Sequence, residues 1–149
     1  MNYTVRQIPP WDHGQLVELA REFHAETGIQ SVFSEKAFLD VVVASEPRKT
    51  CIGLFQGTKL VGALLGMITG QLMTTAKIAQ ELMWYVTPEH RGSRAAFGML
   101  NRFQDWAEAE GATDVIVASL GPDTNKVAEL YKRLGYKLIE THFIKHLKD

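Results

Sequence analysis

Val-Thr-Pro-Glu-His-Arg-Gly-Ser-Arg-Ala-Ala-Phe, residues 86–97, links an apolar run to a helical pattern. The apolar run extends from Leu82 to Val86, and Pro88 ends it. After a basic turn with small residues, one face of an amphipathic helix carries Ala96, Leu100, Phe103 and Ala107. A strand that turns directly into a helix aims unpaired N–H groups at one point, where the helix dipole adds partial positive charge. We therefore expect an anion site, usually for phosphate. The alternative is an ordinary junction with two solvated arginines.

The composition is that of an ordinary globular protein. The 149 residues, 46% of them hydrophobic and 22% charged, suit a single domain over residues 1–149. The net charge of −1 gives no support to nucleic-acid binding driven by bulk charge. The single cysteine, Cys51, excludes an internal disulfide and a cysteine-rich zinc site, and its expected strand position favours a buried filler over a nucleophile. We find no metal-ligand spacing such as His-Glu-x-x-His, so we expect no metal.

The expected location follows from two features of the sequence. No apolar run reaches the roughly 18 residues of a membrane span, and the stretch from Met1 to Trp11 has no signal-peptide core. We therefore expect a cytoplasmic protein without a membrane partner.

Periodicity and turn residues predict a mixture of strands and helices. The expected strands are 3–8, 50–55, 60–69, 77–86, 114–119 and 136–147. The expected helices start at Asp12, at Ser34, near residue 95 and at Gly121. Glycines at 62 and 66 suggest a bulge or close backbone packing, and the unit from 77 to 119 requires a crossover and a parallel pair. We expect an α/β (α+β) fold with a mixed, mostly antiparallel sheet and helices on both faces.

Two segments resemble a known family. Residues 84–96 are similar to the acyl-CoA pyrophosphate loop of the GNAT superfamily of acyl-CoA-dependent N-acetyltransferases. Leu130-Tyr131-Lys132-Arg133-Leu134-Gly135-Tyr136 is similar to the family's penultimate helix and its entry to the next strand. The element order suits a GNAT-like fold over nearly the whole chain. The resemblance implies that acetyl-CoA is the cosubstrate and that the strands at 82–86 and 115–119 splay around the acyl thioester.

The resemblance also implies which residues hold acetyl-CoA. Backbone N–H groups from Gly92 to Phe97 would bind the pyrophosphate, and Val86 would pair with the pantetheine arm as an added strand does. The implied cofactor-binding residues are Val86, Arg91, Gly92, Ser93, Arg94, Ala95, Ala96, Phe97 and Asn125. The family's asparagine corresponds to position 124, where this chain has threonine and asparagine follows at 125. Thr124 is therefore the alternative to Asn125 for this contact with the cofactor.

Arg94 departs from the family pattern, which usually has glycine at this position. If the position requires a positive φ or a close approach of phosphate, arginine impairs binding. If the backbone is already helical there, arginine is tolerated and its guanidinium can contact a phosphate. We favour the second interpretation.

Direct attack by an amine requires a base, donors for the thioester carbonyl and an acid for the departing thiolate. By resemblance Tyr131 is the acid, although its place on an apolar stripe also fits a core aromatic. Glu81 is the candidate base, because it is the only acid in an otherwise apolar strand. A solvent-facing position is the alternative, and a bulge would change the face on which Glu81 lies. Trp84 is expected in the core.

The expected function is N-acetyl transfer from acetyl-CoA to a primary amine of a small molecule or protein. The alternative is a catalytically silent CoA-binding module for regulation or assembly, and a third hypothesis is an interaction protein without a CoA site. An acceptor would contact residues 12–45 and 70–76, and a homodimer is compatible with the sequence. The first of these regions carries acidic residues that suit a cationic amine or form a solvated helix face: Glu18, Glu22, Glu26, Glu35 and Asp40.

Overall fold

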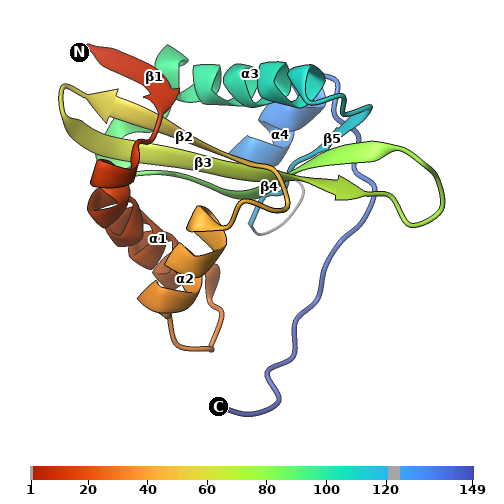
Figure 1. The fold of residues 1–149 in the computed structure, drawn as a ribbon, viewed down its shortest axis with the longest axis horizontal. Helices are drawn as coiled ribbons and strands as arrows, with labels where there is room; N and C mark the ends of the chain where they lie inside the picture. The colour runs from red at the N-terminus through yellow and green to blue at the C-terminus, as the bar shows by residue number, and fades with distance from the viewer. Residues whose placement is uncertain (1, 121–124) are drawn as a thin grey trace.

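Five strands form one sheet at the centre of the protein (Figure 1). The computed structural model describes residues 2–120 and 125–149. The strands lie side by side in chain order: β1 (Tyr3–Gln7), β2 (Lys49–Gln56), β3 (Lys59–Gly70), β4 (Lys77–Val86) and β5 (Asp114–Ile116). β1 to β4 pair antiparallel, whereas β4 and β5 pair parallel. The mixed, mostly antiparallel sheet expected from the sequence is confirmed.

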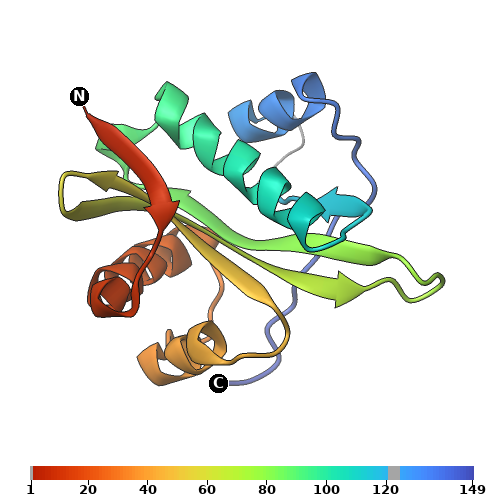
Figure 2. The ribbon, with the colours of Figure 1, turned by 45° about the horizontal axis from the view of Figure 1, so that its top comes forward.

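Helices cover both faces of this sheet, as expected. They are α1 (His13–Thr27), α2 (Glu35–Val43), α3 (Arg94–Ala109) and α4 (Lys126–Arg133), with short 3₁₀ turns η1 (Pro10–Asp12) before α1 and η2 (Pro88–His90) after β4. The Ser34 hydroxyl caps α2 by accepting a hydrogen bond from the N–H of Ala37 at 3.1 Å, and Gly28 ends α1 in a left-handed conformation. α1 and α2 pack on one face, and α3 and α4 on the other (Figure 2). Within the described ranges, no helix has both the length and the apolar character to cross a membrane.

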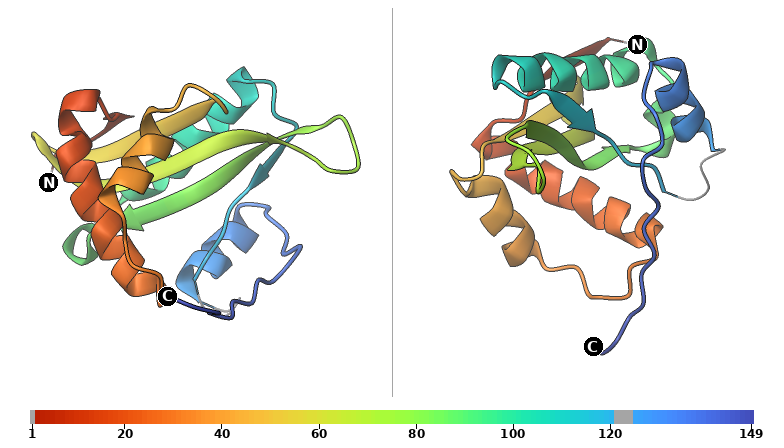
Figure 3. Two further views of the ribbon diagram at one scale, coloured as in Figure 1. Left: turned by 60° about the horizontal axis from the view of Figure 1, so that its bottom comes forward. Right: turned by 90° about the vertical axis from the view of Figure 1, so that its right-hand side faces the viewer.

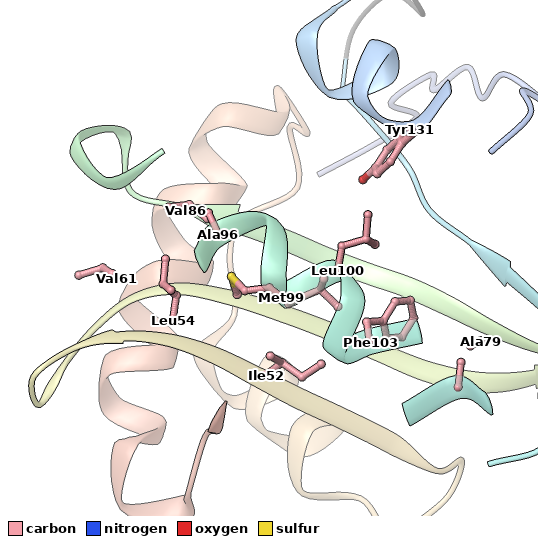
Figure 4. Close-up of a cluster of buried hydrophobic side chains, with 12 residues drawn as sticks. Ile52, Leu54, Val61, Ala79, Val86, Ala96, Met99, Leu100, Phe103 and Tyr131 are labelled. Atoms are coloured by element: carbon pink, nitrogen blue, oxygen red, sulfur yellow. The ribbon is translucent and has the colours of Figure 1, made fainter. Parts of the chain in front are cut away.

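The sheet separates two hydrophobic cores. On the α3 side, Met99 and Phe103 pack against strand residues that include Ile52 and Ala79 (Figure 4). On the α1 side, the core contains Leu16, Leu19, Ala20, Phe55, Leu65, Met83 and Tyr85. Successive side chains of a strand point to opposite faces. The register of β4 therefore decides which of the two layers each of its side chains contacts.

Gly66 lets α3 pack directly on β3. A Cβ atom at this position would lie 2.2 Å from Cε1 of Phe103, so a side chain would displace the ring. The close packing expected at this glycine is confirmed. A bulge lies opposite: Leu65 pairs with Met83 and Gly66 pairs with Glu81, which leaves Leu82 as an extra residue in β4.

The C-terminal part of the chain differs from the sequence prediction. The strand expected over 114–119 ends at Ile116, and the strand expected over 136–147 is not formed. Residues 136–149 instead extend away from the sheet (Figures 1 and 3). Apolar residues in a stretch of sequence favour a strand, but a strand also needs a neighbour for its N–H and C=O groups. The expected start of the last helix, 121–123, lies outside the described residues.

Candidate active site

The loop between β4 and α3 leaves backbone donors at the N-terminus of the helix. Gly92 adopts a φ of 82°, a conformation that disfavours any side chain. The Ser93 hydroxyl caps α3 by accepting a hydrogen bond from the N–H of Ala96 at 3.0 Å. Within residues 2–120 and 125–149, the N–H groups of Arg94 and Ala95 have no hydrogen-bond partner. These two donors and the helix dipole together favour an anion.

Arg94 is the first residue of α3, and its side chain is exposed. In the part of the chain that the structure describes, only glycines have a positive φ. Arginine therefore introduces no backbone strain at the position where the resemblance would place glycine. An open hollow of about 820 Å³ lies beside Arg94, between the loop and Tyr3 of β1. The guanidinium is placed where it can contact an anion bound at the helix N-terminus.

Arg91 is engaged by neighbouring groups of the protein. Its Nε donates a hydrogen bond to the backbone C=O of Val86 at 2.7 Å, and its Nη2 pairs with Glu26 of α1 at 3.0 Å. Its guanidinium carbon also lies 5.3 Å from the centroid of the Tyr85 ring. Arg91 therefore ties the end of β4 to α1, and its charge is shared with a carboxylate.

β4 loses its parallel neighbour partway along its length. β5 pairs only with Ile78 to Gln80, so the following residues of β4 have no strand on that edge within the described ranges. The N–H of Thr87 bonds to β3, at the C=O of Val61. Because backbone groups alternate in direction along a strand, the N–H and C=O of Val86 face the open edge. Arg91 occupies this C=O, which leaves the N–H of Val86 for an extended ligand.

The extra residue at Leu82 determines the face on which Glu81 lies. Ala79 belongs to the core on the α3 side, whereas Met83 belongs to the core on the α1 side. Without a bulge, all three odd-numbered residues from 79 to 83 would share a face. The bulge places Glu81 with Ala79, on the side of α3 and α4. Trp84 of β4 packs on the same side.

Glu81 and Tyr131 converge on the backbone of Ala118, just beyond the end of β5. The Glu81 carboxylate accepts a hydrogen bond from the N–H of Ala118, and the Tyr131 hydroxyl donates one to the C=O of Ala118 at 3.0 Å. Burial raises the pKa of Glu81 to about 7, although the bond from Ala118 acts in the opposite direction. Burial, with the charges of Glu81 and Tyr136, raises the pKa of Tyr131 well above its usual range. Near neutral pH, Glu81 can exchange a proton while Tyr131 keeps its own.

Two aromatic rings lie beside Tyr131. The Tyr131 side chain is 6% exposed, and its ring centroid lies 6.2 Å from that of Trp84 and 5.6 Å from that of Tyr136. The Tyr136 hydroxyl accepts a hydrogen bond from Gln104 of α3. Nε1 of Trp84 is buried and has no acceptor within the described residues. Sequence reasoning missed Ala118, because a backbone contact leaves no signal in residue type.

Three further sequence candidates lie at element boundaries or in the core. The Ala96 side chain is 3% exposed and belongs to the α3-side core, whereas Phe97 is exposed. Asn125 caps α4: its Oδ1 accepts a hydrogen bond from the N–H of Ala128 at 2.7 Å, and its Nδ2 donates one to the C=O of Leu120. Thr124, the alternative to Asn125, lies outside the described residues.

Most of the acidic side chains on α1 and α2 have a cationic neighbour. The ion pairs are Glu18–Arg21, Glu35–Arg21, Asp40–Lys36 and Glu26–Arg91. Glu22 accepts a hydrogen bond from the Tyr85 hydroxyl at 3.3 Å. This pairing favours a solvated helix face over a site built for a cationic amine.

Cys51 lies in β2, where burial raises the pKa of its thiol despite the opposing charge of Lys49. The reactive thiolate is therefore disfavoured, as the filler role requires. In the described ranges, no three or more His, Cys, Asp or Glu side chains group together in a way that could hold a metal ion.

The raised pKa of Glu81 predicts a specific pH dependence of stability. An unfolded glutamate titrates near pH 4.3, so between about pH 4.3 and 7 the folded protein binds more protons than the unfolded chain. The free energy of unfolding should therefore fall as pH rises through this window. Glu81→Gln should remove roughly 1–3 kcal/mol of this decline. Urea unfolding at pH 5 and pH 8 measures this decline. Glu108→Gln is the control, because Glu108 is exposed. If the free energy of unfolding changed equally between pH 5 and pH 8 in the parent and Glu81→Gln proteins, the carboxyl of Glu81 would not be buried as described.

Comparison with known proteins agrees with this architecture. The family model described as "Acetyltransferase (GNAT) family" matches residues 14–136. A search of curated proteins gives no match. Among solved structures, a putative acetyl transferase from Pyrococcus furiosus is 18% identical, with a TM-score of 0.79 over 98% of this chain and 100% of that chain. A ribosomal-protein-alanine N-acetyltransferase from Brucella melitensis biovar Abortus 2308 is 14% identical, with a TM-score of 0.73 over 98% and 100%. A predicted acetyltransferase from Clostridium acetobutylicum, solved with acetyl-CoA, is 15% identical, with a TM-score of 0.76 over 97% and 96%.

At identities of 14–18%, the similarity to solved structures shows the fold alone. The match to the family model spans most of the chain and therefore shows the family. Because the strand-to-helix loop and the site beside it both lie within that match, the protein belongs to the GNAT family of acetyltransferases.

Proposed function

We propose that this protein transfers the acetyl group of acetyl-CoA to a primary amine by direct attack of the amine on the thioester. The observation that carries the proposal is the convergence of Glu81 and Tyr131 on Ala118, where β4 and β5 separate. A carboxyl group that titrates near pH 7 and a phenol that stays protonated suit the base and the acid of this reaction. An amine acceptor is also supported by a structural neighbour that is named as an N-acetyltransferase.

The β4–α3 loop fits the anionic and extended parts of acetyl-CoA. The N–H groups of Arg94 and Ala95 suit the pyrophosphate, and the exposed guanidinium of Arg94 adds a charged donor. The free N–H of Val86 suits an amide of the pantetheine arm. Gly92 and Ser93 shape the turn that presents these donors. When bound, acetyl-CoA supplies an acetyl group that is already activated as a thioester.

The other candidates have supporting roles in this proposal. Arg91 positions Val86 by bonding to its C=O, and Ala96 keeps the first turn of α3 packed on the sheet. Phe97 and Asn125 lie at the N-terminal ends of α3 and α4, from which they can border the bound cosubstrate.

Glu81 is the proposed general base. Because its pKa lies near 7, an appreciable fraction is ionised at neutral pH and can accept a proton from the ammonium, directly or through water. Tyr131 is the proposed general acid. Its hydroxyl bonds to Ala118 in this structure, and release of that bond would free its proton for the departing thiolate. The two groups therefore act on opposite partners of the reaction from one place in the fold.

Arg94→Ala tests the cosubstrate site. Loss of a charged hydrogen bond should weaken binding by about 1.5–3 kcal/mol, which is roughly a 10- to 150-fold increase in Kd. Calorimetric titration with acetyl-CoA measures the change, and Arg102→Ala, on the same helix, is the matched control. A smaller loss with dephospho-CoA would identify the 3′-phosphate as the partner of Arg94. Unchanged affinity would show that the guanidinium does not contact the ligand.

Tyr131→Phe tests the general acid. The ring and its packing against Trp84 are retained, so kcat should fall roughly 10²–10⁴-fold while the affinity for acetyl-CoA changes little. Thiol release with a panel of primary amines measures turnover. Tyr136→Phe removes a hydroxyl from the neighbouring ring and should retain most of the activity. Full turnover by Tyr131→Phe would assign the proton to water or another group. Binding of acetyl-CoA by the parent protein without turnover on any amine would favour the silent CoA-binding module.

Glu81→Gln tests the general base through its pH profile. In the parent protein kcat/KM should rise with pH through about 7, because the ionised carboxylate is the active form. The deficit of Glu81→Gln should shrink at higher pH, where the amine loses its proton without help. A deficit that stays constant with pH would mean that Glu81 positions the acceptor or supports the strand.

A further inference from the structure

Trp84 carries a buried donor for which the folded chain provides no acceptor. Within residues 2–120 and 125–149, two buried side-chain polar atoms lack a hydrogen-bond partner: Nε1 of Trp84 and Oγ1 of Thr87. Both residues follow Gln80, where the edge of β4 that faced β5 becomes open. Buried polar atoms are normally paired, because burial without a hydrogen bond is unfavourable. The place of Trp84 beside the open edge indicates that an acceptor for Nε1 arrives with a ligand.

The indole ring of Trp84 lies between β4 and α4. Its centroid is 6.2 Å from that of Tyr131, with an angle of 34° between the two ring planes. Tyr131 extends from α4 toward the sheet (Figure 4), and its hydroxyl donates a hydrogen bond to the C=O of Ala118, just beyond β5. The contact between the two rings therefore bridges the place where β4 and β5 separate. An extended ligand in this gap would lie against the indole.

The donors along the open edge of β4 follow one order. The free N–H groups at the start of α3 come first, the N–H of Val86 comes next, and Trp84 precedes Glu81 at the point where the strands separate. In the proposed function, the start of α3 suits the pyrophosphate, Val86 an amide of the pantetheine arm, and Glu81 the reacting end. Trp84 therefore adjoins the part of acetyl-CoA between that amide and the thioester. The acceptors there are carbonyl oxygens, and an indole N–H can only donate.

We propose that Nε1 of Trp84 donates a hydrogen bond to a carbonyl oxygen of acetyl-CoA in the gap between β4 and β5. This inference rests on the proposed function, because it takes acetyl-CoA as the ligand. Nε1 is covered in this structure, so it becomes accessible only when the packing around the indole loosens. Release of Tyr131 from Ala118, which the general-acid role already requires, would loosen that packing.

The unpaired donor favours binding of a ligand that carries a carbonyl group at this depth. In the free protein, Nε1 of Trp84 is buried away from water and has no other partner within the described residues. A ligand carbonyl would therefore form this bond without displacing a competing acceptor. A ligand without such a carbonyl would leave the donor unpaired. Trp84 is thus a binding residue that adds specificity to the backbone contacts of β4.

The indole N–H signals of the parent protein provide a direct test by nuclear magnetic resonance. The chain has three tryptophans, Trp11, Trp84 and Trp106, and labelling with the heavy nitrogen isotope gives one indole signal for each. Trp11→Phe and Trp106→Phe assign the Trp84 signal by elimination. Titration with acetyl-CoA should move the Trp84 N–H proton downfield, because a hydrogen bond deshields it. Trp11 is 84% exposed, and its signal is the internal control.

The affinity for acetyl-CoA measures the contribution of the donor. Trp84→Phe should raise the Kd roughly 5- to 100-fold, because a ligand carbonyl in a closed site would lose its donor. Trp106→Phe is the matched control: Trp106 stacks on Phe103 in the same core, near the C-terminal end of α3, and its substitution should leave the Kd unchanged. Benzothienylalanine in place of Trp84 keeps the ring size and removes the N–H, so it should reproduce the increase.

Titration with CoA identifies the carbonyl group. CoA lacks the acetyl group, so an increase in Kd for both ligands on substitution of Trp84 would assign the bond to an amide of the arm. An increase for acetyl-CoA alone would assign the bond to the thioester. Both results support the proposal.

Two results would overturn the proposal in a parent protein that binds acetyl-CoA. The first is a Trp84 N–H signal that stays in place during the titration, and this result counts even where a Trp84 variant does not fold. The second is an unchanged Kd for the benzothienylalanine variant, which would leave Trp84 as a core aromatic. A parent protein that binds no acetyl-CoA would instead overturn the proposed function, and this inference with it.

Discussion

The departure of β5 from β4, after the short parallel pairing at Ile78–Gln80, creates the candidate active site. Beyond Gln80, the edge of β4 that faced β5 has no strand beside it in the described chain. An open edge inside a sheet leaves backbone donors without partners, which is unfavourable unless a ligand, water or side chain supplies them. Arg91 supplies one partner by bonding to Val86, while Glu81 and Tyr131 hold the diverging backbone at Ala118.

Opposite charges are kept apart within this arrangement. The N-terminus of α3 combines free N–H groups with the exposed Arg94, so the loop favours an anion. Glu81 lies on β4 close to Tyr131 and Ala118, where burial outweighs the single stabilising hydrogen bond and holds its pKa near 7. A solvated carboxyl would stay ionised at neutral pH and would be a weaker base. Burial of Glu81 therefore sets the pKa on which its proposed role as a base depends.

Backbone irregularities place the side chains that matter. The bulge at Leu82 moves Glu81 to the side of α3 and α4, and Gly66 opposite it leaves room for Phe103. Gly92 turns the chain so that α3 starts immediately after the loop. The bulge adds a single residue, yet it changes the layer that Glu81 enters, because alternate residues of a strand point to opposite faces.

Local patterns in the sequence were enough to predict the order of elements up to α4, the strand-to-helix loop and the family. These patterns are apolar periodicity, caps such as Ser34, and the small residues from Gly92 to Ala96. The face of Glu81, the pairing of Arg91 with Glu26, and the convergence on Ala118 became clear only in the folded protein. They depend on contacts between residues that are distant in the sequence. The strand expected over 136–147 shows the same limit: apolar residues in this stretch favour a strand, but a strand forms only where another edge meets it.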